Sequence, residues 1–407
     1  MTTSFTPTRA AGLAALADFV PRAGRDYAAT RNHDFGPHSR ENVSALSPYI
    51  RHRLITEAEV VEAVLAAHTP SAAEKFVQEV FWRTYWKGWL ELRPEAWRRY
   101  RVDVERMLPD ADGDYLAAVE ARTGIDCFDA WVTELVDTGY LHNHTRMWFA
   151  SIWIFTLGLP WQLGADLFLR HLLDGDPASN TLSWRWVAGL QTSGKTYLAT
   201  ADNIVRYTEG RFSPTGLATS AVALTEVPLP SPAALTPTRS IPSARAALLL
   251  HGDDLHPESI PLDPAQVVTV ARLTSTEGRS PASVSPQVLE FTAAAMSDAC
   301  TRATAHFGAP LLALDSEQLH SVIDWARDAD ASTIVTPYAP VGPAQERLRA
   351  LEPSLAAAGI ALALVPREWD TLAWPYARRG FFSFRENIPR FIAAQGLAVS
   401  SNRGRAR

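Results

Sequence analysis

Apolar and polar positions in the first half of the chain recur with the period of an α-helix. Leu13, Leu16 and Phe19, for example, lie three residues apart, which places them on one face of a helix. Patterns of this kind continue to about residue 212 and predict a mostly helical region, 1–212. The apolar run at its start is short and lacks a basic lead, so we do not interpret it as a signal peptide.

One apolar stretch inside this region, residues 147–165, carries no charged residue. Its length approaches that of a membrane-spanning helix. Gly158 and Pro160 interrupt it, however, and Arg146 and Asp166 flank it closely. We therefore expect a long helix that is buried in a protein core rather than a membrane span.

The character of the chain changes after residue 212. Residues 213–244 are rich in Pro, Ala, Ser and Thr and lack periodicity, which predicts an extended linker. In residues 245–395 short apolar runs alternate with helical stretches, and this alternation predicts an α/β domain with a parallel sheet and right-handed crossovers. Residues 396–407 form a polar tail that we expect to be disordered.

Five apolar runs are the expected strands of that sheet: residues 246–251, 267–271, 310–314, 333–336 and 361–365. Three stretches with helical spacing lie between them: residues 287–307, 317–329 and 343–358. No G-x-G-x-x-G motif follows the first run, so a dinucleotide-binding fingerprint is missing from this region. The predicted fold class is an all-α domain followed by an α/β domain with a parallel sheet.

Composition adds few constraints. The 407 residues are 47% hydrophobic and 20% charged, which is ordinary for a globular chain of two or more domains. Only two cysteines occur, Cys127 and Cys300, and they are too few for an iron–sulfur cluster. We predict no metal site and a cytoplasmic protein. The net charge of −6 argues against bulk attraction to nucleic acid but leaves room for a local basic groove.

Residues 138–186 concentrate the polar groups that can form a site. TGYLHNHTRM begins this stretch and DGDPASNTLSWRW ends it, with an almost uncharged segment between them. Because a buried polar group requires a partner, polar side chains at both ends of a core segment indicate a buried site for a polar ligand. Asp176 followed by Pro177 is typical of a helix N-cap with proline at the first helical position.

This stretch resembles the flavin-binding domain of the photolyase/cryptochrome family, whose pattern is close to TGWxHNRxRM…DGDxAxNxxxWxW. The matches run without a gap from Thr138 through Trp161 to Trp186. Residues 44–49 and 76–86 are similar to two further elements of that domain. The resemblance implies that region 1–212 binds FAD in an all-α fold.

The resemblance also implies which residues contact FAD: Tyr27, Ser44, Leu46, Ser47, Arg83, Asn143, Arg146, Asp174, Asp176 and Asn180. Two of these assignments have structural alternatives. Ser47 can instead be a helix cap in a turn. Arg83 shares a helix face with Glu79 and Trp82, so it can instead form an ordinary salt bridge there.

A catalytic set follows from the same resemblance: Trp184, Trp161, Asn180 and Glu79. Asn180 is implied to lie beside flavin N5, and Arg146 and Asp174 to pair beside the cofactor. The two tryptophans correspond to members of an electron chain that leads from the flavin to the surface. Leu108 stands at the place of the third member, for which Tyr115 is a candidate substitute. The alternative is that these tryptophans only fill the core.

Five residues match positions that face a flipped-out pyrimidine dimer in the family: Glu79, Trp82, Asn143, Met147 and Trp186. Asparagine rather than a second histidine after His142 favours the cyclobutane type. We therefore expect a lyase that repairs cyclobutane pyrimidine dimers in damaged DNA by light-driven electron transfer from reduced FAD. The alternatives are a cryptochrome-like blue-light receptor without repair activity and a flavoprotein of unrelated chemistry.

The α/β region resembles the family's antenna domain more faintly. LLLHGDDLH at 248–256 is similar to the first strand of that domain, and residues 370–372 and 381–384 are similar to its later part. Since this domain normally precedes the flavin domain, the resemblance implies a circular permutation. It also implies that a second, antenna chromophore of unidentified kind can bind. The sequence leaves the oligomeric state open.

Overall fold

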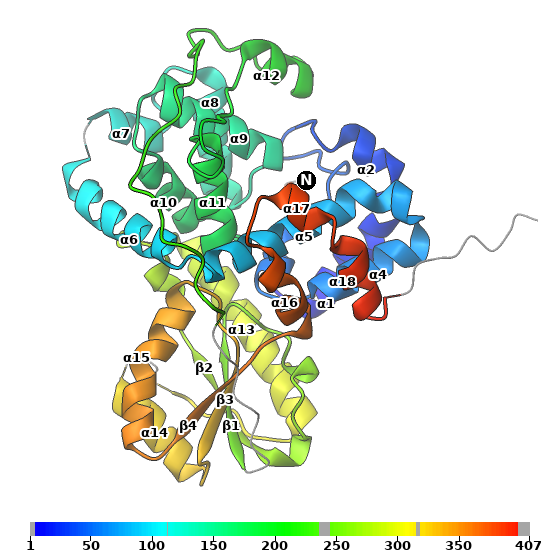
Figure 1. Ribbon diagram of the computed structural model, residues 1–407, viewed down its shortest axis with the longest axis vertical. Coiled ribbons are helices and arrows are strands. Elements are labelled where there is room, and N and C mark those ends of the chain that lie inside the picture. Colours follow the sequence, from blue (N-terminus) through cyan, green and yellow to red (C-terminus); the bar gives the residue numbers. More distant parts are fainter. Residues whose placement is uncertain (1–4, 112, 236–244, 315–317, 398–407) are drawn as a thin grey trace, which may run out of the picture.

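The structure is a computed structural model and describes residues 5–111, 113–235, 245–314 and 318–397 (Figure 1). Up to residue 212 the described residues form helices and no strand, as the periodicity predicts. These helices are α1 (Arg9–Phe19), α2 (Arg25–Thr30), α3 (Ser47–Arg51), α4 (Glu57–Ala67), α5 (Pro70–Glu91), α6 (Glu95–Met107), α7 (Gly113–Val119), α8 (Asp126–Thr138), α9 (Asn143–Ser151), α10 (Trp161–His171), α11 (Pro177–Val187) and α12 (Ala201–Tyr207).

The longest helix of this region, α5, spans 22 residues, and its start follows from its sequence. Thr69 accepts a hydrogen bond from Ala72 N, and Pro70 occupies the first turn, where a missing N–H leaves no bond unmade. The helix contacts α2, α4 and α11. Its inward side is aromatic and buried, from Phe76 to Trp89. α5 is therefore the frame on which the cavity described below is built.

The apolar stretch 147–165 is not one helix, so that prediction is wrong. α9 continues into a π-helical turn at Ile152–Thr156, and α10 begins only at Trp161. Gly158 adopts a left-handed φ of 68°, and Pro160 has no N–H for a helical hydrogen bond. Within the described ranges, no helix has the length and apolar character needed to cross a membrane.

The described residues contain one parallel sheet with the order β2–β1–β3–β4, whose strands are β1 (Ala246–His251), β2 (Val267–Leu273), β3 (Thr333–Pro337) and β4 (Ala361–Val365). α13 (Pro286–Phe307) covers one face, and α14 (Leu319–Asp328) and α15 (Pro343–Ala357) cover the other (Figure 1). Leu248 and Leu250 belong to the same apolar cluster as α13, whereas Ala247 and Leu249 pack with α14 and α15. Both faces are covered, which is why β1 is a continuous apolar run.

The third predicted strand, 310–314, is wrong, because only one bridge forms there, between Leu311 and Val270. Val270 donates to Pro310 O and accepts from Leu312 N, both at 2.9 Å. Pro310 has no N–H to extend the ladder, and Leu311 and Leu312 are 46% and 42% exposed. This apolar run therefore touches the edge of the sheet without joining it.

The described part of the predicted linker, 213–235, contains neither helix nor strand and follows the surface of the helical region (Figure 1). Leu224 N donates to Ala188 O at 3.0 Å, and Ala233 N donates to Leu92 O at 2.8 Å. This part of the segment is extended, as predicted, but it is fixed at several points instead of hanging free. The rest of the predicted linker lies outside the described residues.

Three short helices end the described chain: α16 (Glu368–Ala373), α17 (Phe381–Arg385) and α18 (Ile388–Ala394). They lie against α5, although their sequence follows the sheet (Figure 1). Trp369 stacks on Phe81 with 4.7 Å between ring centroids and donates from Nε1 to Thr84 Oγ1 at 2.8 Å. These C-terminal residues thus complete the core of the helical region. The predicted tail lies outside the described residues from 398 onward.

Candidate functional site

A cavity of about 680 Å³ opens among α5, α9 and α11. Its volume falls in the range, roughly 300–1,000 Å³, of sites that enclose a small molecule. Most residues proposed from the sequence line this cavity: Ser44, Ser47, Glu79, Trp82, Arg83, Asn143, Arg146, Met147, Asp174, Asp176, Asn180, Trp184 and Trp186. Segments that are far apart in the chain therefore converge on one place.

Three of the proposed residues do not line the cavity: Tyr27, Leu46 and Trp161. The ring of Tyr27 packs edge-on against Phe76, with 5.2 Å between centroids, inside the core. Leu46 is fully buried at the start of α3. Trp161 stacks on Tyr100 with 5.8 Å between centroids. All three side chains pack in the core, and the roles assigned to them from the sequence stay predictions.

Several residues that line the cavity were missed by sequence reasoning: Arg31, Asn32, Arg51, Trp86, His144, Tyr197 and Tyr207. Trp86 could have been found, because it follows Trp82 by four residues on the same helix. Arg31 and Tyr197 had no such signal, since they reach the cavity from segments outside any helix.

Asp176 is the N-cap predicted for α11, and it accepts a hydrogen bond from Ser179 N at 2.8 Å. Its other oxygen lies 2.9 Å from Lys87 Nζ and 3.1 Å from Arg83 Nη1. Burial raises the pKa of Asp176, but the cations Lys87, Arg83 and Arg51 outweigh burial and hold the pKa well below its usual value. Asp176 is therefore a permanently charged anchor that fixes the start of α11.

Arg146 and Asp174 form the ion pair predicted for them, with 2.8 Å between Nη2 and Oδ2. Arg146 Nε also donates to Leu141 O at 3.0 Å, which fixes the guanidinium. Asp174 Oδ1 is buried and has no partner among the described residues, so it is available to accept a hydrogen bond from a ligand. Asn180 is held by its Nδ2, which donates to Ala165 O at 2.7 Å.

Trp184 is held in the cavity wall by a close approach of α10. A Cβ at Gly164 would lie 2.3 Å from Trp184 Cη2, so only glycine leaves room for the ring. The ring contacts Phe168 and Trp153, with centroid distances of 5.2 and 6.2 Å. Trp153 in turn contacts Tyr115 at 6.0 Å. A row of aromatic rings therefore leads away from the cavity through Trp184.

The walls of the cavity present flat aromatic faces. Trp82 stacks on Phe381 of α17, with ring centroids 3.6 Å apart and an interplanar angle of 13°. Trp186 stacks on Tyr197 at 5.7 Å. Glu79, which shares a helix face with Trp82, forms an ion pair with Arg31. The stacking partners restrict how either tryptophan can rotate.

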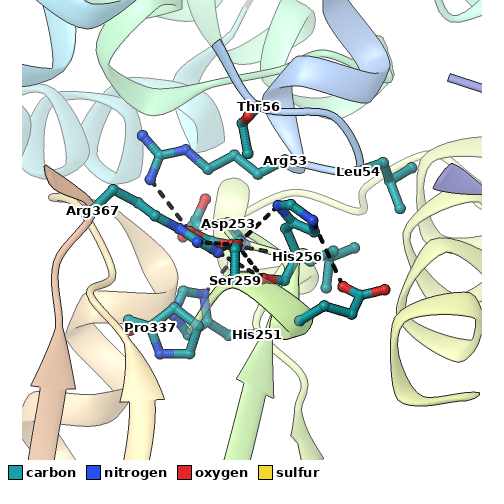
Figure 2. Close-up of polar contacts among 12 residues, drawn as sticks. Arg53, Leu54, Thr56, His251, Asp253, His256, Ser259, Pro337 and Arg367 are labelled. Carbon is teal, nitrogen blue, oxygen red and sulfur yellow. Dashed lines mark hydrogen bonds and ion pairs between the residues drawn. The ribbon is translucent and has the colours of Figure 1, made fainter. Parts of the chain in front are cut away.

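Buried charges join the helical region to the sheet directly beside the cavity. We call these residues the interface ion cluster: Arg51, Arg53, Glu57, Asp253, Asp254, Arg367 and Asp370. Arg53 and Arg367 converge on the turn that follows β1 (Figure 2). Arg367 binds both oxygens of Asp254, at 2.6 and 2.7 Å, and Arg53 binds both oxygens of Asp370 at 2.8 Å. Arg53 adopts a left-handed φ of 49°.

Arg51 links this cluster to the cavity that it lines. Its Nη1 pairs with Asp253, and its Nε donates to Gly175 O at 2.8 Å. Gly175 directly precedes Asp176, the N-cap of α11. The turn after β1 therefore supports, through one guanidinium, the helix that carries Asn180 and Trp184.

The carboxyl edge of the sheet is filled by the chain itself. In open parallel sheets, ligands bind at the point where the connections that leave two neighbouring strands run to opposite sides of the sheet. In this sheet that point lies between β1 and β3. At this point His251 Nε2 donates to Pro337 O at 2.8 Å, and His251 Nδ1 accepts from Asp253 N at 3.2 Å (Figure 2). His52 Nδ1 donates to Gly252 O at 2.6 Å. The binding of an antenna chromophore in this region stays a prediction.

Comparison with known proteins gives the class of the helical region. Residues 76–215 match the family model described as FAD binding domain of DNA photolyase. This part of the chain is therefore similar to the FAD-binding domain of the photolyase/cryptochrome family, a domain that binds FAD. The match covers α5 to α12 and includes most of the cavity-lining residues.

Two curated relatives are deoxyribodipyrimidine photo-lyases. The chain is 37% identical to that of Streptomyces griseus over 150 residues, or 37% of this chain and 32% of the relative. It is 33% identical to that of Thermus thermophilus over 198 residues, or 47% and 45%. A class III photolyase from Agrobacterium tumefaciens aligns with a TM-score of 0.43 and 27% identity over 50% of this chain and 43% of that one. The chain thus matches less than half the length of these relatives.

The residues present fit FAD. The cavity offers the hydroxyls of Ser44 and Ser47 and the guanidinium of Arg146 to phosphates and hydroxyls, and apolar walls to a ring system. Two buried atoms of residues that line the cavity, Asp174 Oδ1 and Trp184 Nε1, have no partner among the described residues, and a ligand that both donates and accepts would suit them. In the described ranges, no group of three or more His, Cys, Asp or Glu is arranged to hold a metal ion.

Proposed function

We propose that this protein repairs cyclobutane pyrimidine dimers in DNA by light-driven electron transfer from reduced FAD. The observation that carries the proposal is the convergence of Glu79, Trp82, Asn143, Met147 and Trp186 on one cavity. A helical core does not require two tryptophans and a carboxylate around a hollow, whereas a pocket that stacks a flipped base and binds its edge does. The names of the relatives support the same reaction.

The side chains divide the work between substrate and cofactor. Trp82 and Trp186 stack on the bases of the dimer and exclude water from it. Glu79 accepts a hydrogen bond from a pyrimidine N–H once it has exchanged Arg31 for the substrate. Asn180 and Asp174 hold the cofactor on the other side of the cavity. Bound FAD in its reduced state supplies the electron when it absorbs light.

Electrons that restore the reduced cofactor enter through Trp184, the tryptophan of the proposed electron chain that lines the cavity. From there the ring contacts continue to Trp153 and Tyr115. Trp161 contacts Tyr100 instead. We therefore assign the next electron transfer after Trp184 to Trp153. Tyr115 takes the last position of the chain, because Leu108, which stands there by sequence, has no aromatic ring.

A blue-light receptor of the cryptochrome kind is the second candidate function. Two observations favour it: Glu79 is already paired with Arg31, and the chain carries a net charge of −6. In a receptor, Glu79 would keep this pair and the cavity would never admit a base. Both functions use the same cofactor, so binding of FAD does not separate them.

Repair under light separates the two functions. Purified protein with reduced FAD is illuminated together with an oligonucleotide that contains one cyclobutane dimer, and restored thymines are measured by chromatography. Dark samples and an undamaged oligonucleotide are the controls. We expect restoration in the light only. A protein that undergoes light-driven flavin reduction but restores no dimer would contradict repair and support the receptor.

A further inference from the structure

The C-terminal segment 378–385 reaches the rim of the cavity. Its helix α17 places Phe381 and Phe384 inward, three residues apart, against α5. Phe384 is fully buried, and Phe381 stacks on Trp82, whose ring also lines the cavity. Phe382 lies between them and is 73% exposed. One turn of helix therefore joins the cavity wall to an exposed aromatic ring.

This segment is held rigidly, so the exposure of Phe382 does not come from a loose chain. Tyr85 Oη donates to Arg379 O at 2.9 Å, and Arg93 Nη2 donates to Arg378 O at 2.7 Å. Both donors belong to α5 or to the residues just after it. A large apolar side chain fixed in water is costly unless it has a partner, and aromatic rings are enriched where partners bind.

The charge of the segment indicates what that partner is. Its sequence, RRGFFSFR, carries three arginines and no acid, in a chain with a net charge of −6. None of the ion pairs among the described residues involves Arg378, Arg379 or Arg385. The guanidinium of Arg385 lies 5.3 Å from the centre of the Phe382 ring. These arginines are therefore free to meet anions.

We propose that segment 378–385 is a second contact surface for the nucleic acid, where its arginines bind phosphates and Phe382 stacks on a base or sugar beside the flipped nucleotide. Basic side chains interleaved with an exposed aromatic ring are the chemistry that binds single-stranded or distorted nucleic acid. An acidic peptide would also meet the arginines. The row formed by Phe381, Trp82 and the cavity favours nucleic acid, because it continues the same stacking surface into the pocket. The inference rests on the proposed function.

The test uses the full chain loaded with FAD and a labelled duplex with or without one cyclobutane dimer, with binding followed by fluorescence anisotropy in a salt series. Phe382→Ala is expected to weaken binding of the damaged duplex about fivefold or more, since stacking a base on an aromatic ring is worth at least ~1 kcal/mol. The double variant Arg378→Ala/Arg379→Ala is expected to make the negative slope of log K against log salt shallower. The change is about one for each phosphate that is no longer bound.

Control variants remove similar groups elsewhere on the surface. Leu116→Ala on α7 removes an apolar side chain that is 46% exposed, and Arg106→Ala on α6 removes one positive charge. In Figure 1 both helices lie at the left edge of the helical region, away from α17, which lies near its centre. Neither control should change binding or its salt slope, and all variants should keep the flavin content of the wild type.

Each outcome decides between the inference and the function on which it rests. If wild-type protein prefers damaged DNA and the segment variants bind it with unchanged affinity and slope, the inference is wrong and the proposed function stands. If wild-type protein shows no preference for damaged DNA, the proposed function fails. A third outcome is that binding of polyglutamate depends on Arg378 and Arg379 while binding of DNA does not. The segment is then a surface for an acidic protein, and the inference is overturned.

Discussion

Removing the charge of Asp253 tests how the sheet supports the cavity. Arg51 is 6% exposed and Asp253 7%, so the pair is almost out of water. In Asp253→Asn the nearest carboxylate left to Arg51 is Asp176 at 3.8 Å, which Lys87 and Arg83 already share. Breaking a buried pair costs about 3–5 kcal/mol, and we expect about 3 kcal/mol because Asp176 retains part of the attraction. Urea denaturation measures this loss.

The same substitution is expected to weaken binding of FAD. Arg51 holds the carbonyl of Gly175, and a shift there moves the start of α11, which carries Asn180 into the cavity. Groups that orient the direct ligands of metal sites are worth about 10–100-fold in affinity, and we expect the lower end of that range. Titration of apoprotein with FAD, followed by flavin fluorescence, gives the dissociation constant.

Asp370→Asn is the control, because Asp370 binds Arg53 in the same interface ion cluster and Arg53 does not line the cavity. This variant should lose stability but keep its affinity for FAD. An equal loss of affinity for FAD in the two variants would show that FAD binding depends on the overall stability of the protein and not on the contacts of Arg51. Unchanged stability in Asp253→Asn would refute the role of the pair.

The remaining predictions concern the cavity and its surroundings. Trp184→Phe should slow light-driven reduction of bound flavin strongly at unchanged flavin content, and Trp161→Phe should slow it less; equal rates in both would contradict the assigned route. Asp174→Ala leaves Arg146 without its carboxylate and should lose FAD, stability or both, measured by flavin absorbance and thermal melting. Trp186→Ala should weaken binding of dimer-containing DNA about tenfold, as stacking worth ~1.4 kcal/mol requires, with FAD content unchanged. Burial lowers the pKa of His142 to about 4, below its unfolded value of about 6.5, so the unfolded state binds more protons between these values and stability should fall as pH drops from about 6.5 to about 4. Denaturation at several pH values should show a shallower slope in His142→Gln.

The sequence predicts those parts of the fold that depend on local patterns. Four strands and the helix at 343–357 follow from continuous apolar runs and from helical spacing. The strand at 310–314 fails because Pro310 cannot donate to the ladder, a property of pairing with a neighbour that the apolar run does not contain. The single helix over 147–165 fails because Gly158 and Pro160 outweigh the apolar pattern.

The site is predictable as far as its residues are close in sequence. The polar groups at both ends of residues 138–186 line the cavity, and because they belong to one short segment, one sequence motif can identify all of them. The stacking of Phe381 on Trp82 and the pairing of Arg51 with Asp253 join residues 299 and 202 positions apart, and neither periodicity nor a short motif encodes such contacts. Family resemblance also proposes Tyr27 as a cofactor contact; its ring packs against Phe76 in the core, and the contact with FAD stays a prediction.

Arg53 sets a limit on how this chain can be changed by recombination. Its left-handed backbone would favour glycine, yet its guanidinium meets carboxylates from the helical region, from the turn after β1 and from α16. Replacing the sheet and its helices with the equivalent part of a relative would keep Arg53 and remove two of its three carboxylates, unless the donor carried acids at the same places. In an exchange between relatives, the acids that follow β1 and β4 therefore have to come from the same donor. These two segments are expected to be inherited as a unit, although more than a hundred residues separate them.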